Sequence, residues 1–493
     1  MLNLAEQITQ DTLARVSAAV KGALADPKLT RALAVSDGLV GLQLEAAAKQ
    51  LVPLMSPFRQ KIGRKGQPGS NAIQWKAITA VRQNAKFSTA EGAAAGAIAT
   101  TVVPKSATFK VVGTRGKVTR EAIAHSQGFD DALAKETANT LLLGMKLEEQ
   151  AILGGNITAL ATPTGLAVAV IVGGGSLAAD AAGYSVRVAA LTLMAANRES
   201  IDRPAAYDGT HANLATGAKT GANPAADGWT AAAARVTSAA VAANDRIKIT
   251  WTAVAGAAAY AVFILKSATG AETLAAIVTQ TSVTVTSHTA GGSALAVADG
   301  TSADANMFDG IVPLINADAS SYKKVLAGKL STSGGELVEI QDMFQALWDS
   351  GKIDDLTLLV GGVDSRTLTK LLTTAGGGPT IFVPTGDEAQ RLVMTQGYHV
   401  GFIVNAVTGK RCPVEVLPWL PGGTILALPN VIPYPDANIS APFEISTSYD
   451  WERIDYAATT STGPVTEFDV RAEEVLKDYF PAGCGIINNI FFG

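Results

Sequence analysis

Residues 119–156, TREAIAHSQGFDDALAKETANTLLLGMKLEEQAILGGN, decide the fold of this chain. Side chains that suit one buried face recur here at roughly the helical period: Phe129, Leu133, Thr137, Leu141, Met145 and Ile152. Asp130 and Asp131 are expected in the first turn, residues 146–149 on the polar back, and residues 154–156 at the end. About 24 residues at ~1.5 Å each give a rod of roughly 36 Å. Since an isolated rod of this kind is only marginally stable, we expect other segments to pack along it.

The bulk composition limits what the chain can be. It has 493 residues, a formal charge of −4 and two cysteines, and it contains neither a basic stripe nor an apolar run long enough for a membrane span. The composition therefore disfavours three classes of protein: one that binds nucleic-acid phosphates directly, a secreted domain held together by disulfides, and a membrane protein. The first residues lack an export signal, so residence in a reducing cytoplasm is the default expectation.

The N-terminal region predicts an arm. Residues 1 to about 50 carry a loose amphipathic stripe: Leu4, Ile8, Leu13, Val16, Val20 and Leu24. Because this stripe is too weak to form a core, the segment is expected to lie on another surface, and a frayed terminal helix remains the alternative.

Two strand-like segments follow the arm, at residues 70–83 and 100–119, with Phe109 and Val111 alternating against Lys110 and Val112. The sequence between them, KFSTAEGAAAGAIA, buries little and is not stiff. We expect a long, projecting β-arm with a mobile tip, completed by packing on a neighbour.

Between about residues 162 and 305 the sequence pattern changes to short strand-like segments separated by turn residues, which predicts an inserted β domain. Ile247, Ile249 and Trp251 alternate on one strand, and Tyr260 opens the next. This pattern resembles fibronectin type III and related immunoglobulin-like sandwiches, in which a Trp and a Tyr pack together in the core.

Mixed helices and strands return after residue 306. A helix is expected over 337–351, a buried strand over 353–362, and a short helix over 364–372 capped by Asp364 or Ser365. Strands and helices do not alternate regularly here, so the fold class is predicted as α+β.

No catalytic, cofactor-binding or metal-binding residues are predicted. The histidines His125, His211, His288 and His399 lie in four separate segments without ligand spacing. Cys412 is expected to be a small buried hydrophobe and Cys484 has no base beside it, while Ser365 and the Gly-Gly pairs match neither a nucleophile elbow nor a phosphate loop. The acidic pairs Glu148, Glu149 and Asp354, Asp355 are expected to be solvated. The chain is thus predicted not to be an enzyme.

Taken in order, these parts resemble the tailed-bacteriophage major capsid proteins of the Hong Kong 97 type. The resemblance is carried by SPFRQKIG before Trp75, the β-arm, the helix ending in ILGGN, the turn Asp309-Gly310-Ile311, the helix LVEIQDMFQALWDSG feeding TLLVGG, the short helix RTLTKLL and PVEVLPWLPGGTILAL. It covers about residues 1–160 and 306–493, and the order of the motifs is what makes it specific.

The resemblance implies a Hong Kong 97-like domain organisation with an inserted all-β immunoglobulin-like sandwich. Its expected parts are an N-terminal arm at 1–56, an extended loop at 57–119, the spine helix of the peripheral domain at 120–160, the insertion at 161–305, an axial domain at 306–435 and C-terminal strands at 436–493.

It also implies a structural function. The expectation is a major capsid protein that assembles through pentamers and hexamers into an icosahedral shell around double-stranded DNA, in the host bacterial cytoplasm. Expected partners are other copies of the chain, scaffolding, portal and decoration proteins, and DNA without sequence-specific contacts; no membrane and no cofactor are expected. An encapsulin-type compartment, or a surface binding protein or enzyme built around the inserted domain, are the alternatives.

Some members of this family link subunits through an isopeptide bond between a loop lysine and an asparagine. Lys86 is the corresponding lysine, and Asn488 or Asn489 are the candidate acceptors. The sequence shows no acid beside them, so this cross-link is the less favoured expectation.

Overall fold

The structure is a computed structural model. It describes residues 14, 15, 17, 18, 56–82, 88–94, 99–126, 131–196, 230–266, 270, 272–288, 305–333, 336–374, 400–432, 439, 441–456 and 465–491. The chain divides into two units, residues 1–50 with 126–131, and residues 51–125 with 132–493. In the first unit residues 14, 15, 17 and 18 are helical, and the remainder of the predicted arm lies outside the described residues. Everything below concerns the second unit.

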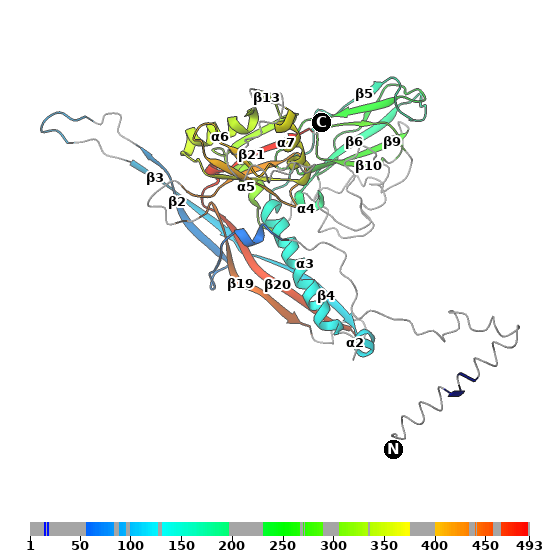
Figure 1. Ribbon diagram of the computed structural model, residues 1–493, viewed down its shortest axis with the longest axis horizontal. Helices are drawn as coiled ribbons and strands as arrows, with labels where there is room; N and C mark the ends of the chain where they lie inside the picture. The colour runs from blue at the N-terminus through cyan, green and yellow to red at the C-terminus, as the bar shows by residue number, and fades with distance from the viewer. Residues whose placement is uncertain are drawn as a thin grey trace, which may run out of the picture. The chain divides into compact units, whose positions relative to one another are not determined.

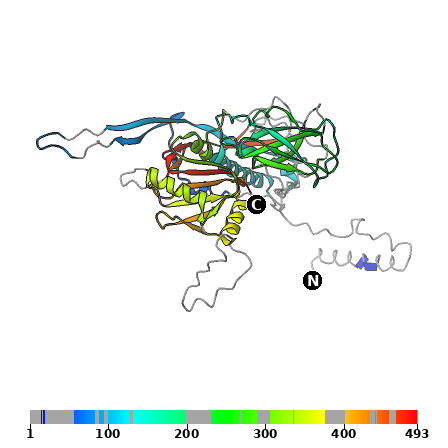
Figure 2. The same ribbon diagram turned by 90° about the horizontal axis from the view of Figure 1, so that it is seen from above.

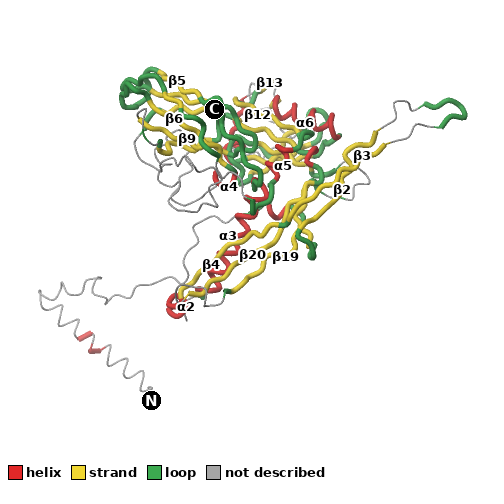
Figure 3. Tube along the Cα trace, turned by 180° about the vertical axis from the view of Figure 1, so that it is seen from behind, coloured by secondary structure: helices red, strands yellow, loops and turns green. Residues whose placement is uncertain are grey.

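The expected spine helix is present as α3 (Ala132–Gly154), which ends at the predicted glycine stop. A shorter helix, α2 (Arg120–Ser126), precedes it. Figures 1 and 3 show α3 lying along a sheet of β1 (Arg64–Gly66), β19 (Phe443–Asp455), β20 (Val465–Asp478) and β4 (Lys110–Thr119), in that order. The Thr114 hydroxyl donates a hydrogen bond to the Thr140 carbonyl of α3 at 3.0 Å, and Gly116 leaves room for the Phe468 ring beneath the helix.

The burial of α3 differs from the amphipathic prediction. Buried residues concentrate in the C-terminal half, where Ala151, Ile152 and Leu153 enter a core shared by both large sheets. Lys146, Glu148 and Glu149, predicted on the polar back, are buried as well, whereas Leu142 and Leu143 are exposed. The physical reason is that the final turns of α3 are surrounded on all sides, so no polar back exists there.

A β-arm is also present, but it is shorter than predicted. Its strands are β2 (Ala72–Arg82) and β3 (Ala99–Thr108), paired antiparallel from Ala72 opposite Thr108 to Arg82 opposite Ala99. Residues 110–119 do not belong to it, since they form β4 and pair with β20. Phe109, buried between β3 and β4, fixes this change of direction, because its ring enters the central core. Figure 2 shows the ribbon leaving the remainder of the unit.

The ribbon is fastened at its base. Lys105 Nζ contacts Asp478 Oδ2 at 2.6 Å, and the Trp75 ring meets the Tyr479 ring edge-on with centroids 6.1 Å apart. Farther out on β3, Val102 and Val103 are exposed.

A second, six-stranded sheet combines five strands from residues 306–435 with one strand from the C-terminal segment. Its strand order is β12 (Tyr322–Gly328), β21 (Gly485–Ile490), β18 (Ile425–Pro429), β15 (Leu356–Val360), β17 (Arg411–Val416) and β16 (Phe402–Val404). One core contains residues of α6 (Val338–Gly351) and α7 (Gly362–Thr374), and another contains residues of α3 and α5 (Ile311–Ala317). Short pieces complete the unit: η2 (Arg59–Lys61), β13 (Thr332–Ser333), β14 (Glu336–Leu337) and η7 (Pro481–Gly483).

Asp364 does not cap α7 in the predicted way. The helix begins at Gly362, before it, and both carboxyl oxygens of Asp364 accept the N–H of Gly423 at 3.0 and 2.9 Å. Burial raises the pKa of Asp364 to about 7 despite these backbone donors. The residue therefore ties α7 to the loop before β18.

Residues between α3 and α5 build two facing sheets, as the sequence predicts for an inserted β region. One has the order β10 (Thr273–Val278), β9 (Ala259–Lys266), β6 (Tyr184–Leu191), β7 (Val236–Thr237); the other has β11 (Ser282–Val285), β8 (Arg246–Thr250), β5 (Ala167–Ile171). The predicted Trp251 and Tyr260 contact is confirmed, with ring centroids 5.3 Å apart at 64°. These sheets enclose a separate apolar core.

The two ends of this region meet at one point. Gly310 N–H donates to the Gly155 carbonyl at 2.8 Å, and Ile157 N–H donates to Asp309 Oδ1 at 2.8 Å. A Cβ on Gly310 would lie 2.6 Å from Ala151 O, so only glycine allows the chain to pass the end of α3 this closely. The helix α4 (Leu193–Ala196) also packs here, with Leu193 against Gly154.

The fold class is α+β, with few helices and many strands, as predicted. No helix among the described residues is long and apolar enough to cross a membrane.

Replacing Gly116 by Ala tests the packing of α3 on its sheet. The added Cβ would stand 2.3 Å from Phe468 Cζ and 2.8 Å from Thr140 Oγ1, so we expect a loss of about 1–3 kcal/mol in the free energy of unfolding, measured by urea denaturation. Gly362→Ala is the control, because nothing lies within 4 Å of its Cβ. Equal stability of the two variants would contradict this packing.

Candidate functional site

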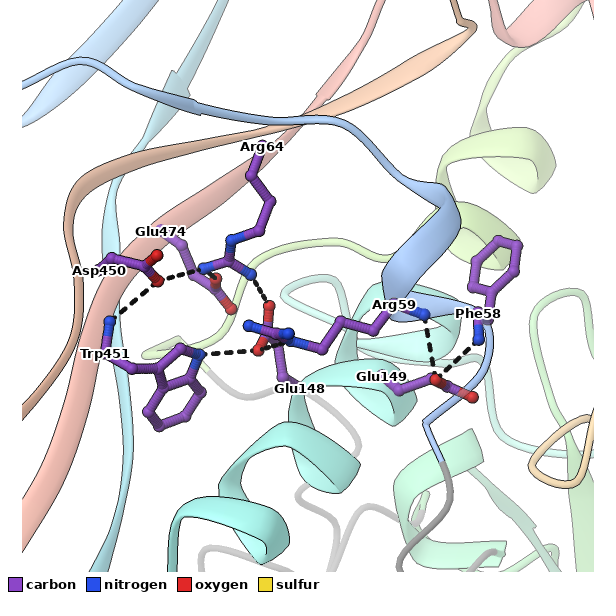
Figure 4. A network of polar contacts seen from close by, with 8 residues as sticks. All are labelled: Phe58, Arg59, Arg64, Glu148, Glu149, Asp450, Trp451 and Glu474. Carbon is purple, nitrogen blue, oxygen red and sulfur yellow. Dashed lines mark hydrogen bonds and ion pairs between the residues drawn. The ribbon is translucent and has the colours of Figure 1, made fainter.

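A buried ion network lies where five elements converge: η2, β1, α3, β19 and β20 (Figure 4). Its charged residues come from segments far apart in the sequence: Arg59, Arg64, Glu148, Glu149, Asp450 and Glu474. This network fastens the segment that leads into the β-arm to the helix α3.

Glu148 is the centre of the network. Its Oε2 atom accepts hydrogen bonds from Arg59 Nε at 2.5 Å and from the Trp451 indole Nε1 at 2.9 Å. Its Oε1 atom pairs with Arg64 Nη1. The Glu148 side chain has no exposed surface, so its charge depends on these two guanidiniums for compensation.

Arg64 extends the network to the sheet. Its Nη2 atom lies 2.9 Å from Asp450 Oδ1 and 3.1 Å from Glu474 Oε2. The Asp450 side chain is 68% exposed, whereas that of Glu474 is fully buried. Of these two further partners of Arg64, only Glu474 is buried.

Glu149 holds the same segment through its backbone. Its Oε2 atom accepts hydrogen bonds from the N–H groups of Phe58 and Arg59 at 2.9 and 3.0 Å. These N–H groups lie at the start of η2, where the helix itself supplies no acceptor for them. Burial raises the pKa of Glu149, while the two N–H donors oppose this shift.

Three buried carboxyl groups therefore face two arginines: Glu148, Glu149 and Glu474 against Arg59 and Arg64. Burial, together with the charge of Glu148, raises the pKa of Glu474 to about 8. The protonated form of Glu474 is therefore favoured relative to an exposed carboxyl group.

The prediction that Glu148 and Glu149 are solvated is wrong. An acidic pair near the end of a helix is ordinarily exposed, and the sequence around it holds no partner. The arginines that neutralise the pair belong to SPFRQKIGRKG, almost ninety residues earlier. One signal of this arrangement was present in the sequence, namely two arginines, Arg59 and Arg64, within this short segment.

A second polar contact joins the inserted region to the six-stranded sheet. Asn489 Oδ1 accepts the Thr281 N–H at 3.0 Å, and Asn489 Nδ2 donates to Thr281 Oγ1 at 2.9 Å. Asn489 is buried and has φ 60°, a backbone conformation that Asn tolerates better than most residues. Both polar atoms of its side-chain amide are therefore hydrogen-bonded, which disfavours Asn489 as an acceptor for a cross-link. The other candidate acceptor, Asn488, is half-buried. The candidate lysine, Lys86, lies outside the described residues.

Within the part of the chain that the structure describes, the cysteines and histidines do not come together in a site. Cys412 and Cys484 are free and buried, and burial raises the pKa of both thiols. His288 packs edge-on against Tyr184, and burial lowers the pKa of His288. His125 is exposed, whereas His211 and His399 lie outside the described residues. Among the described residues no group of three or more His, Cys, Asp or Glu side chains could hold a metal ion.

No protein-family model and no curated protein matches this sequence. Solved structures are similar to it at low identity. The capsid of a native GTA particle is 9% identical over 93% of this chain and 99% of that chain, with a TM-score of 0.43. The capsid of cyanophage A-1(L) is 11% identical over 92% and 98%, with a TM-score of 0.41. The SrpI encapsulin of Synechococcus elongatus is 9% identical over 90% and 92%, with a TM-score of 0.38.

These similar structures include phage capsids, the class of protein that the sequence resemblance indicated. At such identities and TM-scores the similarity transfers no residue role, partner or activity to this chain.

Replacing Arg64 by Met removes the cation that Glu148 and Glu474 share. Because a buried carboxylate then loses compensation, we expect about 3–5 kcal/mol of destabilisation in urea denaturation at pH 7. Lys61→Ala is the control, since Lys61 and its partner Glu415 are 47% and 35% exposed and such a pair contributes about 0–1 kcal/mol. A Met variant as stable as the Lys61 control would show that the network contributes little.

Replacing Asn489 by Ala breaks both hydrogen bonds to Thr281 and leaves a buried N–H unpaired. We expect a loss of about 1–3 kcal/mol and faster proteolysis in the turn at residues 279–281. Asn488→Ala, at the half-buried neighbouring position, is the matched control. The assignment fails if the two variants unfold and are cleaved alike.

Proposed function

We propose that this protein is the major capsid protein of a tailed bacteriophage, with a Hong Kong 97-like fold. In this proposal copies of the chain assemble through pentamers and hexamers into an icosahedral shell that encloses double-stranded DNA. The chain acts by self-association and performs no catalysis.

The observation that carries the proposal is the β2–β3 ribbon. Its base is fastened through Lys105 and Trp75, but the exposed Val102 and Val103 farther out find no cover within the described residues. A two-stranded ribbon is at best marginally stable in water. Such a ribbon is therefore best explained as an element completed by a neighbouring subunit, which a shell supplies at every position.

The edge of the six-stranded sheet supports the same proposal. Phe402 and Val404 of β16 are 48% and 46% exposed, and Val416 of β17 is 42% exposed. Phe402 and Val404 share one face of the outermost strand β16, at an edge where a further surface would cover them. Contacts between copies around a symmetry axis would bury this edge.

The inserted region fits a decoration domain of the immunoglobulin type. Its ends meet at Gly155 and Gly310, and its sheets enclose their own core around Trp251 and Tyr260. An insertion with these properties leaves the host fold intact. We propose that it lies on the outer face of the shell, where it adds contacts between capsomers or weak adhesion to a surface.

Further partners follow from this function. Scaffolding, portal and decoration proteins would bind the shell, and packaged DNA would contact it without sequence specificity, in keeping with the formal charge of −4 and the absence of a basic stripe from the sequence. Assembly would take place in the host bacterial cytoplasm. An encapsulin-type compartment differs in its contents, because its shell holds protein cargo in place of a genome.

Assembly of the purified chain tests the proposal. Gel filtration and negative-stain microscopy should show shells, rings or polymers, and co-purifying DNA would distinguish a phage capsid from a compartment that holds protein cargo. A clean monomer that binds a sugar surface would instead favour a surface binding protein.

Deleting residues 88–99 should prevent closure. Without the tip of the ribbon, the contact with the neighbouring subunit is lost, so we expect soluble subunits and few or no closed shells by microscopy. Deleting residues 334–335, between β13 and β14, is a control for loop shortening elsewhere. If the 88–99 deletion variant formed normal shells, the proposed contact between the β2–β3 ribbon and a neighbouring subunit would be wrong.

A further inference from the structure

The strand β5 lies at an open edge of one sheet of the inserted region. In the order β11, β8, β5 it pairs with β8, from Ala167 opposite Thr250 to Ile171 opposite Arg246. No described strand pairs with its other edge. Figure 1 shows β5 at the margin of the inserted region. A strand in such a position presents a row of backbone N–H and C=O groups that a further strand could bind.

The hydrogen bonds of β8 determine which backbone groups of β5 form that row. The Trp251 N–H donates to the Thr281 carbonyl at 3.1 Å, on the β11 side of β8. Backbone groups of successive residues in an antiparallel ladder point to opposite sides of the strand. Thr250 and Lys248 therefore direct their N–H and C=O groups toward β5.

Two valines of β5 face the open edge with their backbone groups. Ala167 and Ala169 are the partners of Thr250 and Lys248, so their N–H and C=O groups are used within the sheet. Those of Val168 and Val170 consequently point away from β8. The side chains of the same two valines pack against the core of the inserted region but are only half-buried. A further strand at this edge would bind their backbone groups and cover their side chains.

This edge lacks the features that usually protect an edge strand, which are shortness, a bulge, charge or proline. Of the other edge strands of the inserted region, β7 has two residues, β11 has four, and β10 has an irregular register next to Leu274. The register of β5 is regular, and residues 166–172, LAVAVIV, contain neither charge nor proline. They end at Val172, which is 88% exposed. The strand β5 is thus suited to pairing with another strand.

We propose that β5 pairs antiparallel with β5 of a second copy of the chain, across a two-fold axis centred on Ala169. Val168 of each copy then exchanges backbone hydrogen bonds with Val170 of the other, and the two three-stranded sheets become one continuous sheet. The pairing rests on the proposed function and deepens it, because it supplies the contact between the inserted regions of neighbouring capsomers.

Self-pairing suits this strand in geometry and in charge. An antiparallel copy places a C=O group opposite each outward N–H, and residues 166–172 overlap completely when Ala169 is at the centre. The strand itself is uncharged, and Lys248 stands opposite Ala169 on the neighbouring strand. The Lys248 backbones of the two copies would lie about 14 Å apart, since three strand spacings separate them. This separation exceeds the Debye length of ~8 Å at physiological salt, so their repulsion is screened.

The size of the contact indicates where it forms. One strand paired with another buries less than the ~1,000 Å² that a stable interface between free proteins needs. The pairing is therefore expected where other contacts already hold two copies side by side, as they do at two-fold axes of a closed shell.

Oxidative cross-linking of the assembled full-length protein tests the proposal. Ala169 is exposed, and in the proposed pairing it faces its own counterpart at a non-hydrogen-bonded position, where the Cα atoms are about 4.5 Å apart and a disulfide can form. In the variant Ala169→Cys, mild oxidation should convert most of the chain to a disulfide-linked dimer on a non-reducing gel. The native Cys412 and Cys484 are buried, so the unmodified chain should remain monomeric on that gel.

Ala167→Cys is the matched control. Ala167 is also exposed and lies on the same face of β5, but with Ala169 at the centre it is about 14 Å from Ala167 of the second copy. We therefore expect at least about tenfold less dimer from this variant than from Ala169→Cys.

Electron microscopy of the same samples separates this inference from the proposed function. If shells form and Ala169→Cys gives no dimer, or no more dimer than Ala167→Cys, the pairing is wrong and the proposed function stands. If no shells form, the proposed function is refuted, and the pairing that rests on it is refuted as well.

A backbone variant tests whether strand pairing brings the two Ala169 positions together. Val168→Pro in the Ala169→Cys background removes an N–H that β8 does not use, so the chain should still fold and assemble. Because this N–H would bind Val170 of the second copy, the yield of dimer should fall by about tenfold. An undiminished yield in shells of this variant would overturn the proposal.

Discussion

The carboxylate of Glu148 is the interaction on which the remainder of the structure depends. It is completely buried, and it receives Arg59 and Arg64 from residues 58–66 and the Trp451 indole from β19. A buried ion pair of this kind adds little net stability over apolar packing, but removal of one partner is costly because the other charge remains buried. Removal of either partner would therefore leave a buried charge where residues 58–66, the helix α3 and the sheet meet.

The helix α3 contacts three parts of the structure. Its C-terminal turns lie in the central core, Thr140 contacts the strand β4, and Gly154 receives Leu193 from the inserted region. Small residues are essential at these crossings, because a Cβ at Gly154 would lie 2.3 Å from Leu193. The insertion is consequently docked on the host as well as tethered to it, through α4 and through the contact between Asn489 and Thr281.

Much of the local structure could be predicted from the sequence. The helix end at Gly154, the strand that contains Ile247 and Ile249, and the pairing of Trp251 with Tyr260 all follow from short-range periodicity and turn residues. The prediction was wrong where burial depended on distant segments. Residues 110–119 have the composition of an arm strand, yet they pair with β20, since strand composition does not specify a partner. Asp364 likewise looked like a helix cap and instead binds the backbone of Gly423.

The sequence by itself determined the α+β class, the long helix, the β-arm and the inserted β region, because hydrophobic period and turn chemistry are local properties of the chain. Only the tertiary structure decided that Glu148, Glu149 and Glu474 are buried together. An acidic residue can leave water only when a cation or a proton compensates it, and here the compensation comes from Arg59 and Arg64, which no short-range pattern connects to it. Contacts between residues so far apart in sequence depend on the whole chain having folded, and so the candidate site could be recognised only in three dimensions.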